Sequence, residues 1–162
     1  MSKLYRIINN TNEFIAHIAN QLDSISLLAL RLYVSWIFFP AGILKLNDWD
    51  TTLFLFEEEY QVPFLSPDIA AWLGTTGELV FPALLVFGLL TRASALGLFT
   101  VNIVAVISLA EIAPAALAHH IIWGLSLAVV LVFGGGNFSL DRLISKRTTI
   151  SNDMANSPLV NY

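Results

Sequence analysis

The stretch Gly74-Thr-Thr-Gly-Glu-Leu-Val-Phe-Pro-Ala-Leu-Leu-Val-Phe-Gly-Leu-Leu-Thr-Arg92 decides how the rest of the chain is interpreted. It is apolar enough to cross a membrane, yet it carries one carboxylate, Glu78, well inside the run. An ionisable side chain is costly to bury in hydrocarbon, so it is retained where neighbouring segments supply partners. The sequence therefore predicts a bundle of membrane helices with a polar site around Glu78.

Composition supports a membrane protein with one domain. Of the 162 residues, 56% are hydrophobic and 12% are charged, against about 25% charged residues in soluble domains. The mean hydropathy is +0.71. No basic stripe with interleaved aromatic residues is present, so nucleic acid is not expected as a partner. The absence of cysteine excludes disulfides, thiolate metal sites and a thiol relay carried by this chain.

Four helical membrane spans are predicted from the apolar runs. They cover residues 25–46, 69–90, 93–112 and 117–133 and together form a transmembrane domain over residues 25–136. Only two residues separate the second span from the third, so these helices should be antiparallel neighbours. The predicted fold class is all-α, an integral membrane four-helix bundle.

The segments outside the spans predict how the bundle is oriented. Residues 1–24 have apolar side chains at helical spacing, which indicates an amphipathic helix lying on the membrane interface. Residues 137–162 form a polar tail whose end we expect to be disordered. Cations gather in the N-terminal segment, between the second and third spans and in the tail, whereas residues 47–68 are acidic. The positive-inside rule then places both termini in the cytoplasm and the acidic loop outside the inner membrane.

Several polar side chains are predicted to meet in the outer half of the bundle. Lys45 and Glu78 differ in depth by about 12 Å at 1.5 Å per residue, and their side chains lean towards each other because helical side chains point to the N-terminus. Rotation of the other helices could add Asn102, His120 and Trp123 to this cluster. The predicted cofactor-binding cluster is therefore Glu78, His120, Lys45, Asn102 and Trp123.

The same residues also admit structural interpretations. Glu78 is as well explained by a buried ion pair that fixes helix register as by a functional carboxylate. Arg31 and Lys45 are expected to be structural, in ion pairing with Glu78 or, for Arg31, in snorkelling or capping carbonyl groups. Asn102 is a common contact between helices, and Trp123 is a common packing residue.

No motif in the chain predicts a catalytic residue or a metal site. His119 and His120 are adjacent and point about 100° apart on a helix, so they do not form a metal-binding pair. A phosphate loop, a nucleophile elbow and metal-ligand spacing are all missing from the sequence.

Taken together, these pieces resemble the DoxX family of small bacterial membrane proteins, over about residues 28–143. The pieces that carry the resemblance are Arg31 with Gly42-x-x-Lys45, Glu59-Tyr-Gln-Val-Pro63, Gly77-Glu78, Gly88-Leu-Leu-Thr-Arg92, His120-x-x-Trp-Gly124 and Ser139-Leu-Asp141. The chain departs from the family in having Gly134-Gly-Gly136 where a proline often stands between glycines. The resemblance implies a four-helix bundle in the bacterial inner membrane and an association with redox physiology, since some relatives resemble membrane subunits of thiosulfate:quinone oxidoreductase or partners in oxidative-stress complexes.

Three functions are compatible with these observations. The leading hypothesis is a redox-associated subunit, at most part of an oxidoreductase complex, in which Glu78 and His120 face a quinone-like lipid. The alternative is a non-catalytic adaptor that docks a membrane or periplasmic redox protein through the acidic loop. A small proton-linked transporter is a weaker alternative, because the two halves share no inverted repeat. Quinone is the one cofactor that these hypotheses include, and we expect the protein to lie in a lipid bilayer.

Overall fold

The structure, a computed structural model, describes residues 2–155, with side chains described for residue 13 and residues 22–148. Helices follow one another along the chain, and this part of it contains no strand: α1 (Ser2–Asn47), α2 (Trp49–Glu58), α3 (Pro67–Phe87), α4 (Thr91–Ile107), α5 (Pro114–Phe133) and α6 (Leu140–Ala155). The predicted all-α class is therefore confirmed.

Within residues 2–155, three helical segments are long and apolar enough to cross a membrane. They are Leu22–Asn47 of α1, Pro67–Phe87 and Pro114–Phe133. The remaining apolar helix, Thr91–Ile107, has 17 residues and is about 26 Å long at 1.5 Å per residue. Length and composition thus support a multi-pass membrane protein with three full-length spans and one shorter apolar helix.

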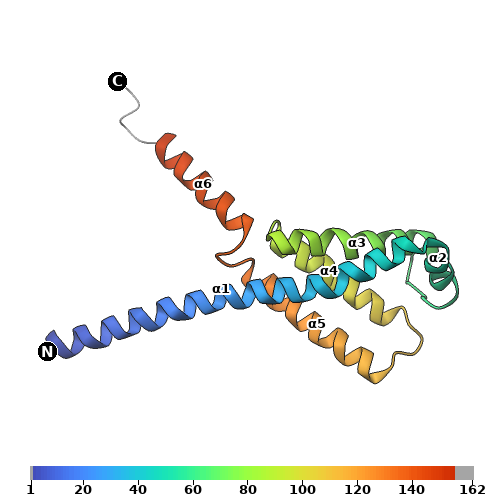
Figure 1. Cartoon of the computed structure of the whole chain (residues 1–162), viewed down its shortest axis with the longest axis horizontal. Coiled ribbons are helices and arrows are strands. Elements are labelled where there is room, and N and C mark those ends of the chain that lie inside the picture. The colour runs from blue at the N-terminus through green and yellow to red at the C-terminus, as the bar shows by residue number, and fades with distance from the viewer. Residues whose placement is uncertain (1, 156–162) are drawn as a thin grey trace.

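The helices α1, α3, α4 and α5 form the bundle, with α2 packed against α3 at one end (Figure 1). We call this the α2 end and the opposite one the α6 end. A core of fully or nearly buried apolar side chains holds the bundle together: Val34, Phe38, Leu85, Ala95, Leu98, Leu127 and Val130. Because these residues come from α1, α3, α4 and α5, packing fixes which face of each helix points inwards.

Two helix boundaries differ from the predicted ones. The helix α4 ends at Ile107 rather than residue 112, because the next carbonyl, that of Ser108, accepts the Gln61 amide at 2.7 Å. Pro114 begins α5 instead of ending the preceding span, and a proline fits the first helical turn because no amide hydrogen is needed there. The connection at residues 108–113 is therefore longer than expected.

The turn between α3 and α4 also starts earlier than predicted. Gly88 adopts a left-handed conformation with φ of 66°, and its amide bonds to the carbonyls of Leu84 and Leu85. A glycine is favoured in this conformation because it has no Cβ. The second span consequently ends at Phe87 rather than residue 90.

The N-terminal part of α1 and the helix α6 both extend beyond the α6 end of the bundle (Figure 1). The helix α1 runs without a break through residue 24, where the predicted interfacial segment meets the first span. Most side chains of residues 1–21 lie outside the described part, so their place on a membrane surface stays a prediction. The tail forms α6, a helix that we did not predict. Disorder is expected for the last dozen residues, but residues 151–155 belong to α6, and residues 156–162 lie outside the description.

Close packing of α1 on α3 sets the register of the site described below. A Cβ atom added at Gly42 would lie 2.8 Å from Leu79 Cγ and 3.1 Å from the Cβ atom of Glu78. Only a glycine therefore allows the two helices to approach this closely. Lys45 follows Gly42 by about one helical turn, which brings it alongside Glu78.

Candidate functional site: a cavity between an ion pair and a histidine

Lys45 on α1 and Glu78 on α3 form an ion pair. Their Nζ and Oε2 atoms are 2.5 Å apart, and the two side chains are 24% and 11% exposed. The sequence predicts this pair, because the depths of Lys45 and Glu78 along their helices let the two side chains reach each other. Partial exposure of Lys45 leaves the pair accessible from the space next to it, so it is not sealed between the two helices.

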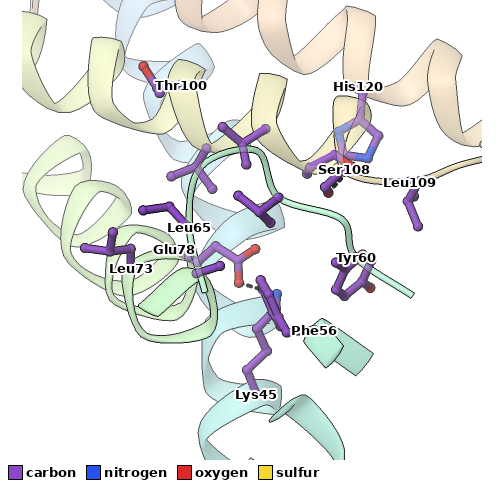
Figure 2. Close-up of a pocket in the computed structure, with 16 residues that line it drawn as sticks. Lys45, Phe56, Tyr60, Leu65, Leu73, Glu78, Thr100, Ser108, Leu109 and His120 are labelled. Carbon is purple, nitrogen blue, oxygen red and sulfur yellow. Dashed lines mark hydrogen bonds and ion pairs between the residues drawn. The ribbon is translucent and has the colours of Figure 1, made fainter. Parts of the chain in front are cut away.

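That space is a cavity of about 400 Å³ at the α2 end, a size within the range of small-molecule sites. Its walls come from α1, α2, α3, α4 and α5 and from both loops at this end. Figure 2 shows the Lys45–Glu78 pair on one side and the His120 ring on another, with apolar side chains between them. The apolar lining includes Phe56, Val62, Leu65, Leu73, Val101 and Val104. The cavity thus combines apolar walls with a few separated polar groups.

His120 on α5 is held in place by Asn102 on α4. The Asn102 Nδ2 atom donates to the His120 carbonyl oxygen at 3.0 Å, and Asn102 Oδ1 lies 2.9 Å from His120 Nδ1. A carbonyl oxygen can only accept, so the first bond fixes which end of the amide is nitrogen. Asn102 Oδ1 must then accept from Nδ1–H, and the neutral imidazole presents an unprotonated Nε2.

Trp123 is not in the cavity lining, although we predicted it for the cluster. Its ring packs edge-on against Phe38, with 5.6 Å between ring centroids, and against His120 at 4.8 Å. The indole nitrogen is buried without a hydrogen-bond partner in the described residues. Asn102 also stays outside this cavity and instead lines a second, apolar one between α4 and α5. The structure therefore brings Lys45, Glu78 and His120 to one cavity, with Asn102 and Trp123 supporting the histidine.

Tyr60 and Ser108 line the cavity and were missing from the predicted cluster. They belong to the two loops at the α2 end, which are joined by an isolated bridge between Tyr60 and Leu109 and by the Gln61 amide. Burial raises the pKa of Tyr60, and the charges of Glu59 and Glu78 raise it further, so the phenol stays protonated. The Glu59-Tyr-Gln-Val-Pro63 segment was one signal that could have pointed to Tyr60.

Arg31 lies away from the ion pair, at the α6 end, although we grouped it with Lys45 and Glu78. Its side chain is fully buried, and the guanidinium donates to four carbonyl oxygens at 2.5 to 3.1 Å, those of Leu85, Val86, Gly135 and Phe138. The expectation that Arg31 caps carbonyl groups describes this arrangement. The cation ties the end of α3 to the glycine-rich turn after α5.

Asp141 provides a second tie at the α6 end. Its two carboxylate oxygens accept from the amides of Leu90 and Thr91, each at 2.8 Å, and its own amide donates to the Gly88 carbonyl at 3.0 Å. Burial alone would raise the pKa of Asp141, but the hydrogen bonds from Thr91 and Leu90 and the charge of Arg31 lower it overall. A carboxylate thus caps the start of α4.

Metal binding has no support in the residues that the structure describes, where no group of three or more His, Asp or Glu side chains is placed to hold an ion. The apolar walls and the few separated polar groups of the cavity are typical of sites for small organic molecules.

Comparisons with known proteins agree with the membrane character of the chain. A family model described as DoxX matches residues 26–119. A Haemophilus influenzae protein described as uncharacterized is 34% identical over 133 residues, which cover 76% of this chain and 86% of that protein. No solved structure matches the chain. The matched range contains Lys45, Glu78 and Asn102 and ends just before His120.

Proposed function

The chain belongs to the DoxX family of membrane proteins, and on this basis we propose that it is a redox-associated membrane subunit that binds the headgroup of a quinone-like lipid. One observation carries the proposal. The cavity at the α2 end has apolar walls that suit a ring and an isoprenoid chain, and it places an ion pair and a histidine at separate positions on those walls.

The polar groups suit the proton chemistry of quinones. Reduction of a quinone takes up protons and oxidation of a quinol releases them, so a binding site benefits from groups that exchange protons. Glu78 and His120 are such groups, and both line the cavity. The Lys45 ammonium offsets the cost of burying the Glu78 carboxylate. The chain would supply the binding site, while an electron-carrying partner would supply or remove the electrons.

We further propose that the protein lies in the bacterial inner membrane with both termini in the cytoplasm. The cations of the chain support this orientation, because Arg92 and the basic residues Arg142, Lys146 and Arg147 lie at or after the α6 end, whereas the α2 end is acidic. In this orientation the cavity opens in the outer half of the membrane, and the N-terminal part of α1 lies on the cytoplasmic side.

Lipid extraction tests the proposal directly. The protein is purified in mild detergent, and its co-purifying lipids are quantified by mass spectrometry, alongside a Glu78→Gln variant. A Glu57→Gln variant is the matched control, because Glu57 is an exposed acid of α2 outside the cavity lining. Quinone should be enriched in the wild type and in the control and reduced in Glu78→Gln. Equal quinone content in all three preparations would contradict the proposal.

A second candidate function, a non-catalytic adaptor, is favoured by the exposed acids Glu57, Glu58 and Glu59 at the α2 end. A basic partner surface would complement them. Charge reversal of all three to Lys should abolish co-purification of such a partner, whereas Glu78→Gln should preserve it. The opposite pattern would favour the lipid site.

A further inference from the structure

Most polar side chains that line the cavity already use their hydrogens in hydrogen bonds within the protein. The Ser108 hydroxyl donates to the Ala105 carbonyl at 3.3 Å, and the Thr100 hydroxyl donates to the Leu96 carbonyl at 3.0 Å. Each hydroxyl oxygen keeps lone pairs but has no hydrogen left for a bound molecule. These two residues can therefore only accept from a ligand.

His120 is restricted in the same way by Asn102. Since Nδ1–H donates to Asn102 Oδ1 at 2.9 Å, the neutral ring offers only the lone pair of Nε2. No protein group in the described residues hydrogen-bonds to Nε2. His120 lines both this cavity and the apolar one between α4 and α5, and Nε2 is the ring nitrogen left to accept from a bound molecule.

Glu78 adds a further acceptor on the other wall. Its Oε2 atom is paired with Lys45, while Oε1 has no hydrogen-bond partner in the part of the chain that the structure describes. An ionised carboxylate carries no hydrogen to donate. Among the polar lining residues, Lys45 and Tyr60 keep donors, because one ammonium hydrogen is directed at Glu78 and the other two, with the Tyr60 hydroxyl hydrogen, remain for a ligand. The acceptor groups Glu78, Thr100, Ser108 and His120 therefore outnumber the two donor groups of the lining.

A ligand that matches this lining must bring hydroxyl hydrogens. We infer that the cavity selects the reduced, quinol form of its lipid over the quinone, with the quinol O–H groups donating to His120 Nε2 and Glu78 Oε1. This inference rests on the proposed function. The carbonyl oxygens of a quinone can only accept, so at either position they would face another lone pair and leave a desolvated acceptor unpaired. Sites built to hydrogen-bond a hydroxyl group discriminate strongly against analogues that lack it.

Asn102 acts as a positioning residue in this scheme. It does not line the cavity, yet it decides which nitrogen of His120 carries the hydrogen. Replacing it by leucine would leave the tautomer of the ring free, so Nε2 could present either a lone pair or an N–H to a ligand. The preference for the quinol should then weaken, although every cavity-lining side chain is retained.

Equilibrium binding with matched probes tests this inference. The full-length protein in lipid nanodiscs is titrated anaerobically with a decyl-substituted benzoquinol, with the corresponding quinone and with the quinol dimethyl ether, which keeps the ring and loses both O–H groups. The quinol should bind at least about tenfold more tightly than the other two probes, the scale of one hydrogen bond to a charged or buried acceptor. Calorimetry supplies the three dissociation constants.

Variants locate the preference in the named atoms. The quinol-to-quinone affinity ratio should fall towards one in Asn102→Leu and in Glu78→Gln. It should be unchanged in Ser126→Ala, which removes a buried hydroxyl of α5 that bonds within its own helix and lies outside the cavity lining. The Asn102→Leu result stands on its own if Glu78→Gln proves too unstable to purify.

The outcomes separate this inference from the proposed function. Equal binding of quinol and quinone, or tighter binding of the quinone, would overturn the inference and leave the lipid site in place. Binding of none of the three probes would overturn the proposed function and the inference with it. An unchanged affinity ratio in Asn102→Leu would remove the role assigned to His120.

Discussion

Lys45 and Glu78 pair across the interface of α1 and α3, with 2.5 Å between Nζ and Oε2, and the pair lies on a cavity wall. Each charge is largely removed from water, so each depends on the other for compensation. The pair consequently contributes to stability and shapes the cavity at once.

Removing both members of the pair should cost less than the sum of the two single removals. We expect Lys45→Met and Glu78→Leu each to lower the free energy of unfolding by about 2 kcal/mol or more, because the remaining charge is left unpaired. The double variant should lose less than the sum of the two. Reversible unfolding in mixed micelles measures these values, and additive losses would show that the pair is not coupled.

Gly42 should not tolerate a methyl group, whereas Gly74 should. An alanine Cβ at Gly42 would lie 2.8 Å from Leu79 Cγ, but at Gly74 the nearest atom is Phe56 Cζ at 3.5 Å. We expect Gly42→Ala to cost about 1–3 kcal/mol by overpacking. Gly74→Ala should be neutral or slightly stabilising, because alanine favours the helix. Equal stability of the two variants would contradict the close approach of α1 and α3.

Arg31→Lys should destabilise the α6 end. A lysine cannot reproduce the planar fork that donates to four carbonyl oxygens at this site. The loss of several charge-assisted hydrogen bonds should lower the free energy of unfolding by about 3 kcal/mol. Arg142→Lys is the matched control, since Arg142 is exposed, and it should stay within about 0.5 kcal/mol of the wild type.

Asp141 should make stability depend on pH in the acidic range. Its pKa in the folded protein lies below the ordinary value of 3.8, so its contribution is fully present above that value and is lost as the pH falls through the folded pKa. Asp141→Asn should be less stable than the wild type at pH 7, and the difference should shrink below about pH 4. Thermal unfolding of both proteins across this range measures the difference. A constant difference at every pH would contradict the role of the carboxylate.

Some of this arrangement followed from the sequence because it depends on local spacing. The apolar runs predicted the helices, and counting 1.5 Å per residue along them brought Lys45 and Glu78 within reach of each other. The membrane class followed from the low charge content. The helix ends were less predictable, because Ile107 is the last residue of α4 through a contact between Ser108 and Gln61 in two different loops.

What only the tertiary structure decided was the rotation of the helices and the pairing of the loops. The rotation of the helices places His120 on the cavity wall with Asn102 behind it, and it turns Trp123 towards the core. At the α6 end, Arg31 contacts carbonyl groups. Bridging of the loops added Tyr60 to the lining. Hydropathy and spacing fix which residues lie at similar depth, but the rotation of each helix depends on packing between surfaces distant in the chain. The sequence determined that Glu78 needs a cation; the fold decided that this pair faces a cavity.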